Sequence, residues 1–279
     1  MGAAADHSPR SEGWHAGLRL GFRAGAHRTV LAERERHGPL AVQRPFYPEG
    51  EVCHVYLLHP PGGVVGGDAL AIDVQIGSGA KTLITTPGAT KFYRSAGARA
   101  KQVQRIAVEN GATLEWLPQE NIFFPGAEVE LETQVELQGD ARLALWEIHC
   151  LGRPVISEGF YSGHIDSRLN VSRDGSPQLM ERLRVDTDNR ARLSLMAGLA
   201  VGGTLLITHA GEEEVMACRD LLFASGPDYA GASLLEDILV VRYLGDSTER
   251  ARRLFTDIWQ KLRAGTLGHA PGVPRIWAT

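Results

Sequence analysis

The stretch from Ala127 to Leu137 alternates apolar side chains with acidic or amide side chains at a period of two. One face carries Ala127, Val129, Leu131, Val135 and Leu137, and the other carries Glu128, Glu130, Glu132, Gln134 and Glu136. Only a half-buried β-strand sorts residues in this way. This pattern therefore limits the fold more than any other feature of the chain.

Similar segments of five to eight residues recur from Leu18 to about Ile207, and their connectors carry glycine, proline, aspartate or asparagine. They are Val52–Leu58, Leu70–Ile76, Thr82–Thr86, Gln102–Val108, Thr113–Leu117, Arg142–Ile148 and Leu179–Val185. The 32 glycines agree with many tight turns. Many short strands with no helices between them predict a sandwich, a barrel or a β-solenoid.

The last quarter of the chain has a different period. Residues 211–224 place apolar side chains at helical spacing, and residues 246–264 carry a stronger stripe formed by Ala251, Leu254, Phe255, Ile258, Trp259 and Leu262. We expect Asp246 with Glu249 to cap this second helix, Gly265 to end it, and Ile238–Leu244 to form a strand between the helices. The predicted organisation is a disordered leader at 1–14 and a single domain at 15–279. That domain would comprise a β body at about 15–210, a helix-containing α+β section at about 211–264 and a tail at 265–279.

Charge and cysteine content exclude several classes of function. A formal net charge of −4 argues against a nucleic-acid-binding protein, which needs clustered cations to neutralise phosphates. The three cysteines, Cys53, Cys150 and Cys218, suggest no disulfide framework and favour a reducing compartment. The first residues lack an apolar signal region, and no run of eighteen apolar residues occurs, so we expect a cytoplasmic protein without membrane segments.

The densest motif is the glycine-rich segment from His59 to Asp68. Glycine-rich turns can expose N–H groups to a phosphate. This one lacks both the GK[ST] and the G-x-G-x-x-G pattern, and a strand follows it, so no helix dipole would face an anion. We therefore favour a turn at which two segments approach closely.

Thr85 to Ser95 form a second loop, in which Pro87-Gly88 marks a turn. Lys91, Tyr93 and Arg94 would project from it, either as a solvated surface or as contacts to a protein partner, since tyrosine and arginine often anchor interfaces.

Several acids interrupt apolar segments, and a buried carboxylate is costly unless it is paired, hydrated or bound to a metal. They are Asp68, Glu120, Glu147 and Glu181. Each alone would most often pair with a nearby arginine such as Arg142, Arg153 or Arg182. Parity places Glu147 on the same, inward face as Leu143 and Leu145. We hypothesise that several inward acids line a wet passage and relay a divalent cation.

Residues for tight metal binding or hydrolysis are not grouped in the sequence. Cys53-His54 and His149-Cys150 are adjacent pairs on strands, so their side chains point to opposite faces. A tight nickel site built only from protein ligands is therefore not expected, and G-x-S-x-G is absent.

Six motifs in order resemble the UreD/UreH urease accessory proteins from about Trp14 to the C-terminus. They are Gly38-Pro39-Leu40 with Gln43–Pro48, His59–Asp68, Thr86–Ser95, Glu115–Glu120, Leu151-Gly152-Arg153-Pro154 with Glu158, and Pro274–Thr279. One departure is Ser157-Glu158, where the family often has Gly-Glu.

This resemblance implies a β-helix-like stack of strands with a few helices near the C-terminus. It also implies a non-enzymatic scaffold that binds apo-urease, a UreF-type protein and the GTPase UreG. Nickel would pass through a water-filled tunnel without being held as a stable cofactor. The tunnel candidates are Asp68, Thr90, Glu147 and Glu181, and the other candidate partner contacts are Lys91, Tyr93, Arg94 and Trp277 on the C-terminal tail.

Two alternatives remain from the sequence. One is an enzyme that holds a phosphate-bearing ligand in the glycine-rich turn, and the other is a β-solenoid whose partners are not urease.

Overall fold

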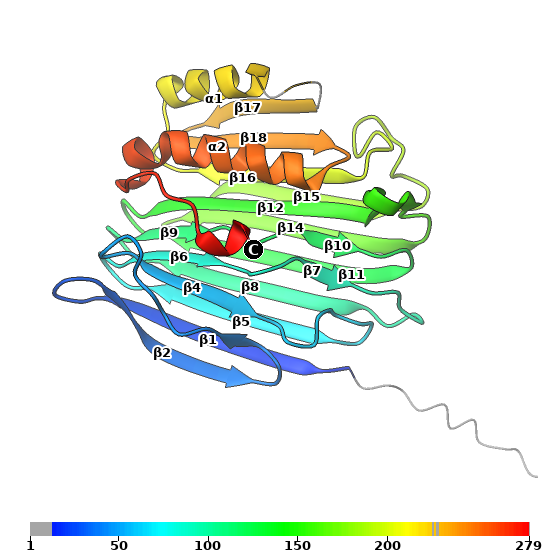
Figure 1. Cartoon of the computed structure of the whole chain (residues 1–279), viewed down its shortest axis with the longest axis horizontal. Helices are drawn as coiled ribbons and strands as arrows, with labels where there is room; N and C mark the ends of the chain where they lie inside the picture. The colour runs from blue at the N-terminus through cyan, green and yellow to red at the C-terminus, as the bar shows by residue number, and fades with distance from the viewer. Residues whose placement is uncertain (1–12, 225, 227–228, 279) are drawn as a thin grey trace, which may run out of the picture.

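Two β-sheets stack face to face in the computed structural model, which describes residues 13–224, 226 and 229–278 (Figure 1). The first sheet has seven strands in the order β15-β14-β11-β8-β5-β1-β2. The main path of the second sheet is β17-β18-β16-β12-β9-β6-β4-β3, with β7, β10 and β13 attached beside it. The mainly β, solenoid-like fold predicted from the sequence is therefore confirmed.

The strands of the first sheet are β1 (His15–Ala24), β2 (Thr29–His37), β5 (Ala69–Ile76), β8 (Ala100–Val108), β11 (Ala127–Leu137), β14 (Gly163–Arg173) and β15 (Ser176–Asp186). Those of the second are β3 (Ala41–Val42), β4 (Cys53–Leu58), β6 (Lys81–Thr85), β7 (Thr90–Phe92), β9 (Thr113–Trp116), β10 (Asn121–Phe123), β12 (Arg142–Arg153), β13 (Glu158–Gly159), β16 (Val201–Ile207), β17 (Tyr229–Leu235) and β18 (Ile238–Gly245). The helices are α1 (Glu212–Ala224) and α2 (Thr248–Leu267), with short 3₁₀ turns η1 (Pro154–Ile156) and η2 (Arg275–Ala278).

The middle of the chain forms successive coils, each of which passes from the first sheet to the second. β5 leads to β6, β8 to β9 and β11 to β12, and equivalent strands of neighbouring coils pair in parallel. Each coil crosses over in the same tight turn and ends on a fully buried alanine, Ala80, Ala112 or Ala141. This stacking of equivalent turns makes the fold a solenoid rather than a sandwich of hairpins.

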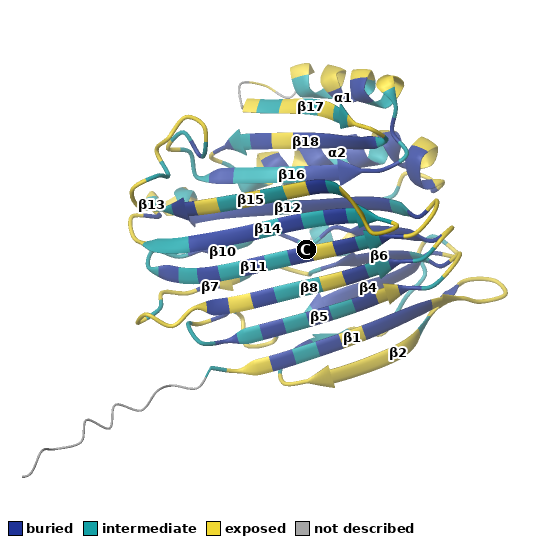
Figure 2. Cartoon of the chain, turned by 180° about the vertical axis from the view of Figure 1, so that it is seen from behind, coloured by how far each residue is buried: buried dark blue, intermediate teal, exposed yellow. Residues whose placement is uncertain are grey.

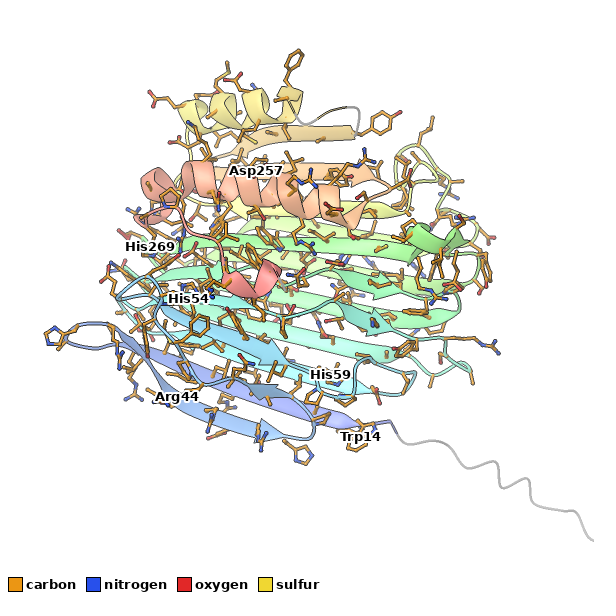
Figure 3. The ribbon with its side chains drawn as sticks, viewed as in Figure 1. Trp14, Arg44, His54, His59, Asp257 and His269 are labelled. Carbon is orange, nitrogen blue, oxygen red and sulfur yellow. The ribbon has the colours of Figure 1, made fainter. Side chains whose placement is uncertain are left out.

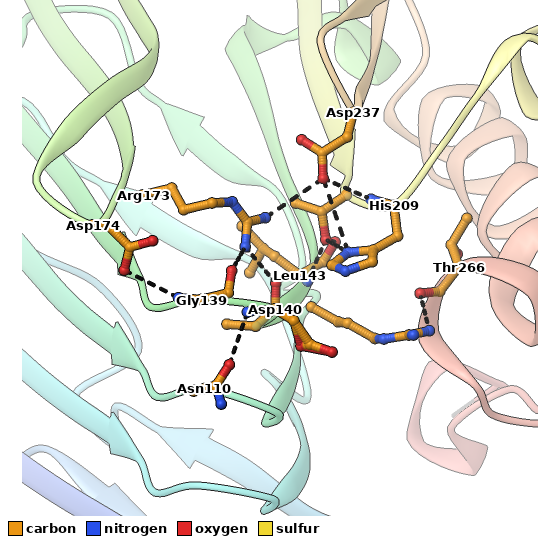
Figure 4. A network of polar contacts seen from close by, with 12 residues as sticks. Asn110, Gly139, Asp140, Leu143, Arg173, Asp174, His209, Asp237 and Thr266 are labelled. Carbon is orange, nitrogen blue, oxygen red and sulfur yellow. Dashed lines mark hydrogen bonds and ion pairs between the residues drawn. The ribbon is translucent and has the colours of Figure 1, made fainter.

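Side chains of one turn also bind the backbone of the next. The Asn110 side-chain oxygen accepts a hydrogen bond from the Asp140 N–H (2.9 Å), and Asp174 Oδ1 accepts one from the Gly139 N–H (3.0 Å) (Figure 4). Arg142 Nη1 donates to the Thr266 carbonyl (2.9 Å), so this end of the stack is also tied to the end of α2.

The main hydrophobic core fills the space between the sheets. On β11, the residues of the predicted apolar face are buried, and the residues between them are partly or fully exposed (Figure 2). This alternation gives the first sheet one face toward the core and one toward solvent.

β12 is buried on both faces because α2 covers the outer side of the second sheet (Figure 1). Leu143 and Leu145 face the core between the sheets. Trp146, on the opposite face, packs against Phe255 and Trp259 of α2, with ring centroids 6.3 and 6.4 Å apart. β12 is therefore shared by two hydrophobic cores.

The predicted helices are present, but the ends expected for the second one are wrong. Ser247, not Asp246, is the N-cap, and its hydroxyl accepts a hydrogen bond from the Arg250 N–H (3.2 Å). Asp246 instead accepts a hydrogen bond from the Ala200 N–H (3.0 Å). The helix continues past Gly265, because Leu267 is buried in its last turn, and it ends at Gly268 with φ of 73°.

The predicted leader at residues 1–14 lies outside the described residues except for Gly13 and Trp14. The Trp14 N–H donates to Asp68 Oδ1 at 2.7 Å, and this bond places the start of β1 beside the glycine-rich segment.

Candidate functional site

Two cavities lie along the space between the sheets, and Glu147 lines both. The larger cavity, about 610 Å³, is bounded by β12, β14, β15, β16, β17 and β18 together with the segment before β16. The smaller, about 240 Å³, is bounded by β4, β5, β8 and β9 and by the loops 59–63 and 86–91. The Glu147 side chain is therefore part of the wall that the two cavities share.

A row of polar side chains crosses the apolar interior at this point. Gln104, Thr133 and Ser167 belong to the first sheet, and Glu147 and His149 belong to β12 of the second. The Thr133 hydroxyl lies 2.6 Å from Glu147 Oε1 and 3.2 Å from the Gln104 side-chain oxygen.

His149 continues this row toward β14 and β10. Its Nε2 is 3.2 Å from the Ser167 hydroxyl and 3.6 Å from Glu147 Oε2. Its Nδ1 is 3.4 Å from the amide nitrogen of Asn121, the β10 residue paired with it in register. The row therefore connects strands of both sheets through side chains that can solvate a cation or water.

The alternating pattern of the strands places these groups inside. Glu147 and His149 follow Leu143 and Leu145 on one face of β12, whereas Trp146 lies on the other. The inward position predicted for Glu147 from parity is confirmed. Thr133 opposes Gln104 directly in the parallel pairing of β11 with β8, which brings two polar residues side by side.

Glu181 lines the larger cavity, but a cation neutralises its charge. Its carboxylate pairs with the Arg242 guanidinium and accepts a hydrogen bond from the Thr204 hydroxyl (3.1 Å). The fold brings Glu147 and Glu181 to the wall of one cavity. Among the described residues, Glu181 has an arginine ion pair there, whereas Glu147 has no ion pair with an arginine or lysine.

The expected arginine partners of the acids are wrong. Arg182 pairs with Asp166, and Arg153 makes a two-pronged pair with Glu158. Glu120 is held instead by Arg252 of α2 (3.2 Å). Sequence neighbours on a strand point to opposite faces, so the partners come from other elements.

Asp68 does not line either cavity. It is 5% exposed, and its two oxygens accept hydrogen bonds from the backbone N–H groups of Trp14 (2.7 Å) and Val65 (2.9 Å). Both bonds fix the end of the glycine-rich turn, so the contacts of this carboxylate are structural.

The glycine-rich turn packs against the loop at 85–95 instead of leaving an open cradle. A Cβ on Gly63 would lie 2.1 Å from the Tyr93 ring, and one on Gly66 would lie 2.1 Å from the Ser95 hydroxyl. The two loops also share backbone hydrogen bonds: the Val64 N–H donates to the Lys91 carbonyl (2.7 Å), and the Tyr93 N–H donates to the Val64 carbonyl (2.9 Å). These contacts support the interpretation of a close approach between two segments.

The motif-bearing loops gather at the end of the stack opposite the tight turns. Thr90, on β7, lines the smaller cavity together with Lys91 and His59. Tyr93 is 36% exposed and packs against Phe124 (4.8 Å), and Arg94 is exposed above Gly126. Burial lowers the pKa of His59, so this cavity wall favours the neutral imidazole.

Trp277 lies against the outer core. Its ring centroid is 5.3 Å from that of Trp146 and 5.9 Å from that of Trp259, and its Nε1 donates to the Thr85 hydroxyl (2.9 Å). The side chain is half-buried, so a partner could contact only its remaining exposed part.

The soft ligands are separated, as their strand positions predict. Cys53 and Cys150 belong to different cores, all three cysteines are buried free thiols, and burial raises the pKa of the Cys150 thiol to about 12. No group of three or more His, Cys, Asp or Glu side chains that could hold a metal occurs within residues 13–224 and 229–278.

Sequence reasoning missed most of the polar row, although each member leaves a signal. Thr133 is the one polar residue on the apolar face of β11, and Gln104 and Ser167 likewise interrupt inward faces of β8 and β14. The sequence favours a hydrogen-bonded, structural role for His149 over a metal-ligand role, and the structure gives it Ser167 and Asn121 as neighbours. A search for polar residues at inward positions would have found all four.

A second polar cluster lies between α2 and the outer face of the second sheet. The Arg263 guanidinium is fully buried and binds Glu115 and Glu49, while His54 and His269 lie at the same end of α2 (Figure 3). Burial, the largest single effect, raises the pKa of Glu49, but the Arg263 guanidinium and the His54 imidazole, 3.3 Å away, outweigh it and lower the pKa to about 2.

Neither described helix is both long and apolar enough to cross a membrane.

A family model described as UreD urease accessory protein matches residues 15–278. Urease accessory protein UreD of Alcanivorax borkumensis is 48% identical over 97% of this chain and 94% of its own length. Those of Klebsiella aerogenes and Aliivibrio fischeri are 48% and 45% identical, over 97% and 96% of this chain and 99% and 98% of their own. The chain therefore belongs to the UreD family of urease accessory proteins.

Proposed function

We propose that this protein is a non-catalytic maturation factor that binds apo-urease together with UreF- and UreG-type accessory proteins and conveys nickel toward the urease active site. The reducing cytoplasm is the compartment that suits three free, buried thiols.

The observation that carries this proposal is the polar row at Glu147, which is part of the wall shared by two cavities inside an otherwise apolar core. Polar side chains across a hydrophobic interior cost free energy unless they are hydrated or paired. A route for a hydrated divalent cation gives the row a function, because carboxylate, hydroxyl and amide oxygens hold such ions weakly.

The loops around the smaller cavity support partner binding. Lys91, Tyr93 and Arg94 are exposed beside the cavity wall formed by Thr90, so a protein docked on this end of the stack would cover one end of the route. Tyrosine and arginine are the residue types that most often anchor such contacts.

The test is urease activation in cells that co-express this chain with the urease subunits and the UreF- and UreG-type proteins. We expect Glu147→Gln with Glu181→Gln to lower the nickel content and activity of purified urease several-fold, while pull-down of the urease subunits is unchanged. The matched control is Glu132→Gln, since Glu132 lies on the outward face of β11.

Nickel content equal to that of the control would remove the route from the proposal. Failure of the unaltered chain to co-purify with either the urease subunits or a UreF-type protein would remove the scaffold role.

A further inference from the structure

The C-terminal segment 268–278 crosses the outer core as a strap that is held near its two ends (Figure 1). Near its start, Arg263 Nη1 donates a hydrogen bond to the Ala270 carbonyl (2.6 Å). Near its end, the Trp277 ring packs against the tryptophans of the outer core, and its Nε1 donates to the Thr85 hydroxyl (2.9 Å). The part between these contacts belongs to no helix or strand, so a modest change in free energy is enough to release the strap.

His269 lies at the start of the strap, and its imidazole is buried (Figure 3). The residue is 7% exposed, and its Nε2 has no hydrogen-bond partner among the described residues. A protonated ring would carry an additional N–H donor that finds neither water nor an acceptor at this position. Burial accordingly lowers the pKa of His269.

Charged side chains interact with His269 from several elements, but they are already paired with one another. They are Glu115 on β9, Arg263 on α2, Lys81 on β6, and Glu49 and Glu51 in the loop before β4. Arg263 binds Glu115 and Glu49, and Lys81 binds Glu51. Because the two cations oppose an imidazolium while the carboxylates favour it, these charges do not offset the effect of burial.

We infer that His269 is an acid-sensitive latch, at which uptake of one proton releases the strap 268–278 from the outer core. Release would uncover the Trp277 ring and the tryptophan faces beneath it, so acidification would create an aromatic surface on the second sheet. The inference is independent of the proposed function.

The sign of the effect follows from the two states of the strap. In the released strap the imidazole is in water and has its ordinary pKa of 6.5, whereas the docked ring takes up a proton less readily. The docked state is therefore fully favoured above pH 6.5 and loses stability as the pH falls. Between pH 7 and pH 5 the population of released strap rises by at most about 25-fold.

Hydrogen exchange of the Trp277 indole N–H, followed by NMR on the full-length chain, measures release, because this group is bonded to Thr85. Its protection relative to free tryptophan at the same pH should fall at least about fivefold between pH 7 and pH 5. In His269→Gln it should change by less than about twofold. His37→Gln, an exposed histidine on β2, should respond as wild type, and the backbone amides of β11 should keep their protection in every protein.

A second measurement leaves His269 unaltered. If protonation releases the strap, release must in turn make protonation easier, because the two equilibria are linked. We therefore expect the NMR titration of the His269 ring in Trp277→Ala, which lacks the anchor at the far end, to have its midpoint at least about half a pH unit above that of wild type.

His54 is the other buried imidazole of this cluster, 1% exposed and 3.3 Å from Glu49. A pH response that persists in His269→Gln but disappears in His54→Gln would overturn the latch. Constant indole protection in wild type, or an equal His269 midpoint in Trp277→Ala and wild type, would overturn it as well. If His269→Gln leaves the strap released at pH 7, the comparison of midpoints decides.

Discussion

Arg263 joins α2 to the second sheet, and its removal should destabilise the protein strongly. The guanidinium is fully buried and forms two-pronged pairs with Glu115 (2.7 and 2.7 Å) and Glu49 (2.6 and 2.9 Å). It also donates to the Ala270 carbonyl (2.6 Å) and lies 4.7 Å from the centroid of the Trp259 ring.

The perturbation is Arg263→Met, which keeps the length of the side chain and removes its charge. Glu115 is fully buried, so its carboxylate would keep only the Trp259 Nε1 donor (2.6 Å). Removing one partner of a buried ion pair costs about 3–5 kcal/mol, because the other charge remains uncompensated. We therefore expect a loss of about 3–5 kcal/mol in the free energy of unfolding.

The double variant Arg263→Met/Glu115→Gln tests the cause. A neutral amide can still accept the Trp259 bond, and no unpaired charge remains beside the methionine. We expect the double variant to be about 1–3 kcal/mol more stable than Arg263→Met alone, since replacing a buried pair is less costly than breaking it.

Urea unfolding followed by tryptophan fluorescence measures both values, because Trp146, Trp259 and Trp277 surround this region. The control is Arg253→Met, an exposed arginine of the same helix paired with Glu249, which should change stability by less than about 1 kcal/mol. An Arg263→Met loss as small as that of the control would refute the reasoning, as would a double variant no more stable than the single one.

Two further predictions concern the same layer. The pKa of Glu49 falls from its ordinary value of 4.5 to about 2 in the folded protein, so the stabilisation that the ionised carboxylate contributes is complete above pH 4.5 and is lost as pH falls toward 2. Between pH 5 and pH 2, the free energy of unfolding measured in urea should therefore fall by about 3 kcal/mol less in Glu49→Gln than in wild type. Parallel pH curves for the two proteins would contradict this. Trp277→Ala should lower the free energy of unfolding by about 2 kcal/mol, which is below the range for a fully buried tryptophan because the ring is half-buried. A loss below about 0.5 kcal/mol, as for an ordinary surface substitution, would show that the tail does not stabilise the outer core.

Most of the strands could be predicted because alternation is a property of each segment alone. The face predicted for 127–137 is the buried face of β11, and the stripe of residues 251–262 is the buried face of α2. The error at Gly265 arose because glycine more often follows a helix than lies within it. Here Thr266 and Leu267 are both buried, so packing outweighs the cost of the glycine.

The polar clusters could not be assembled from the sequence because they depend on register and on contacts between distant elements. Gln104, Thr133 and Ser167 each interrupt an apolar face, but only parallel pairing of β8, β11 and β14 brings them together. Arg263 similarly interrupts the stripe of α2, and its partner Glu115 lies 148 residues away on β9. In every case the sequence shows a polar residue at a position where the period requires an apolar one. It does not show which residue is its partner.

The two clusters are connected through β12. Trp146 packs outward against α2, and the next residue, Glu147, points inward to the wall shared by the two cavities. Because a strand moves as a unit, a displacement of α2 would shift Trp146 and with it the carboxylate that faces His149. The ion pairs of Arg263 hold α2 in place, so a free energy of a few kcal/mol in the outer layer protects the 3.6 Å spacing inside.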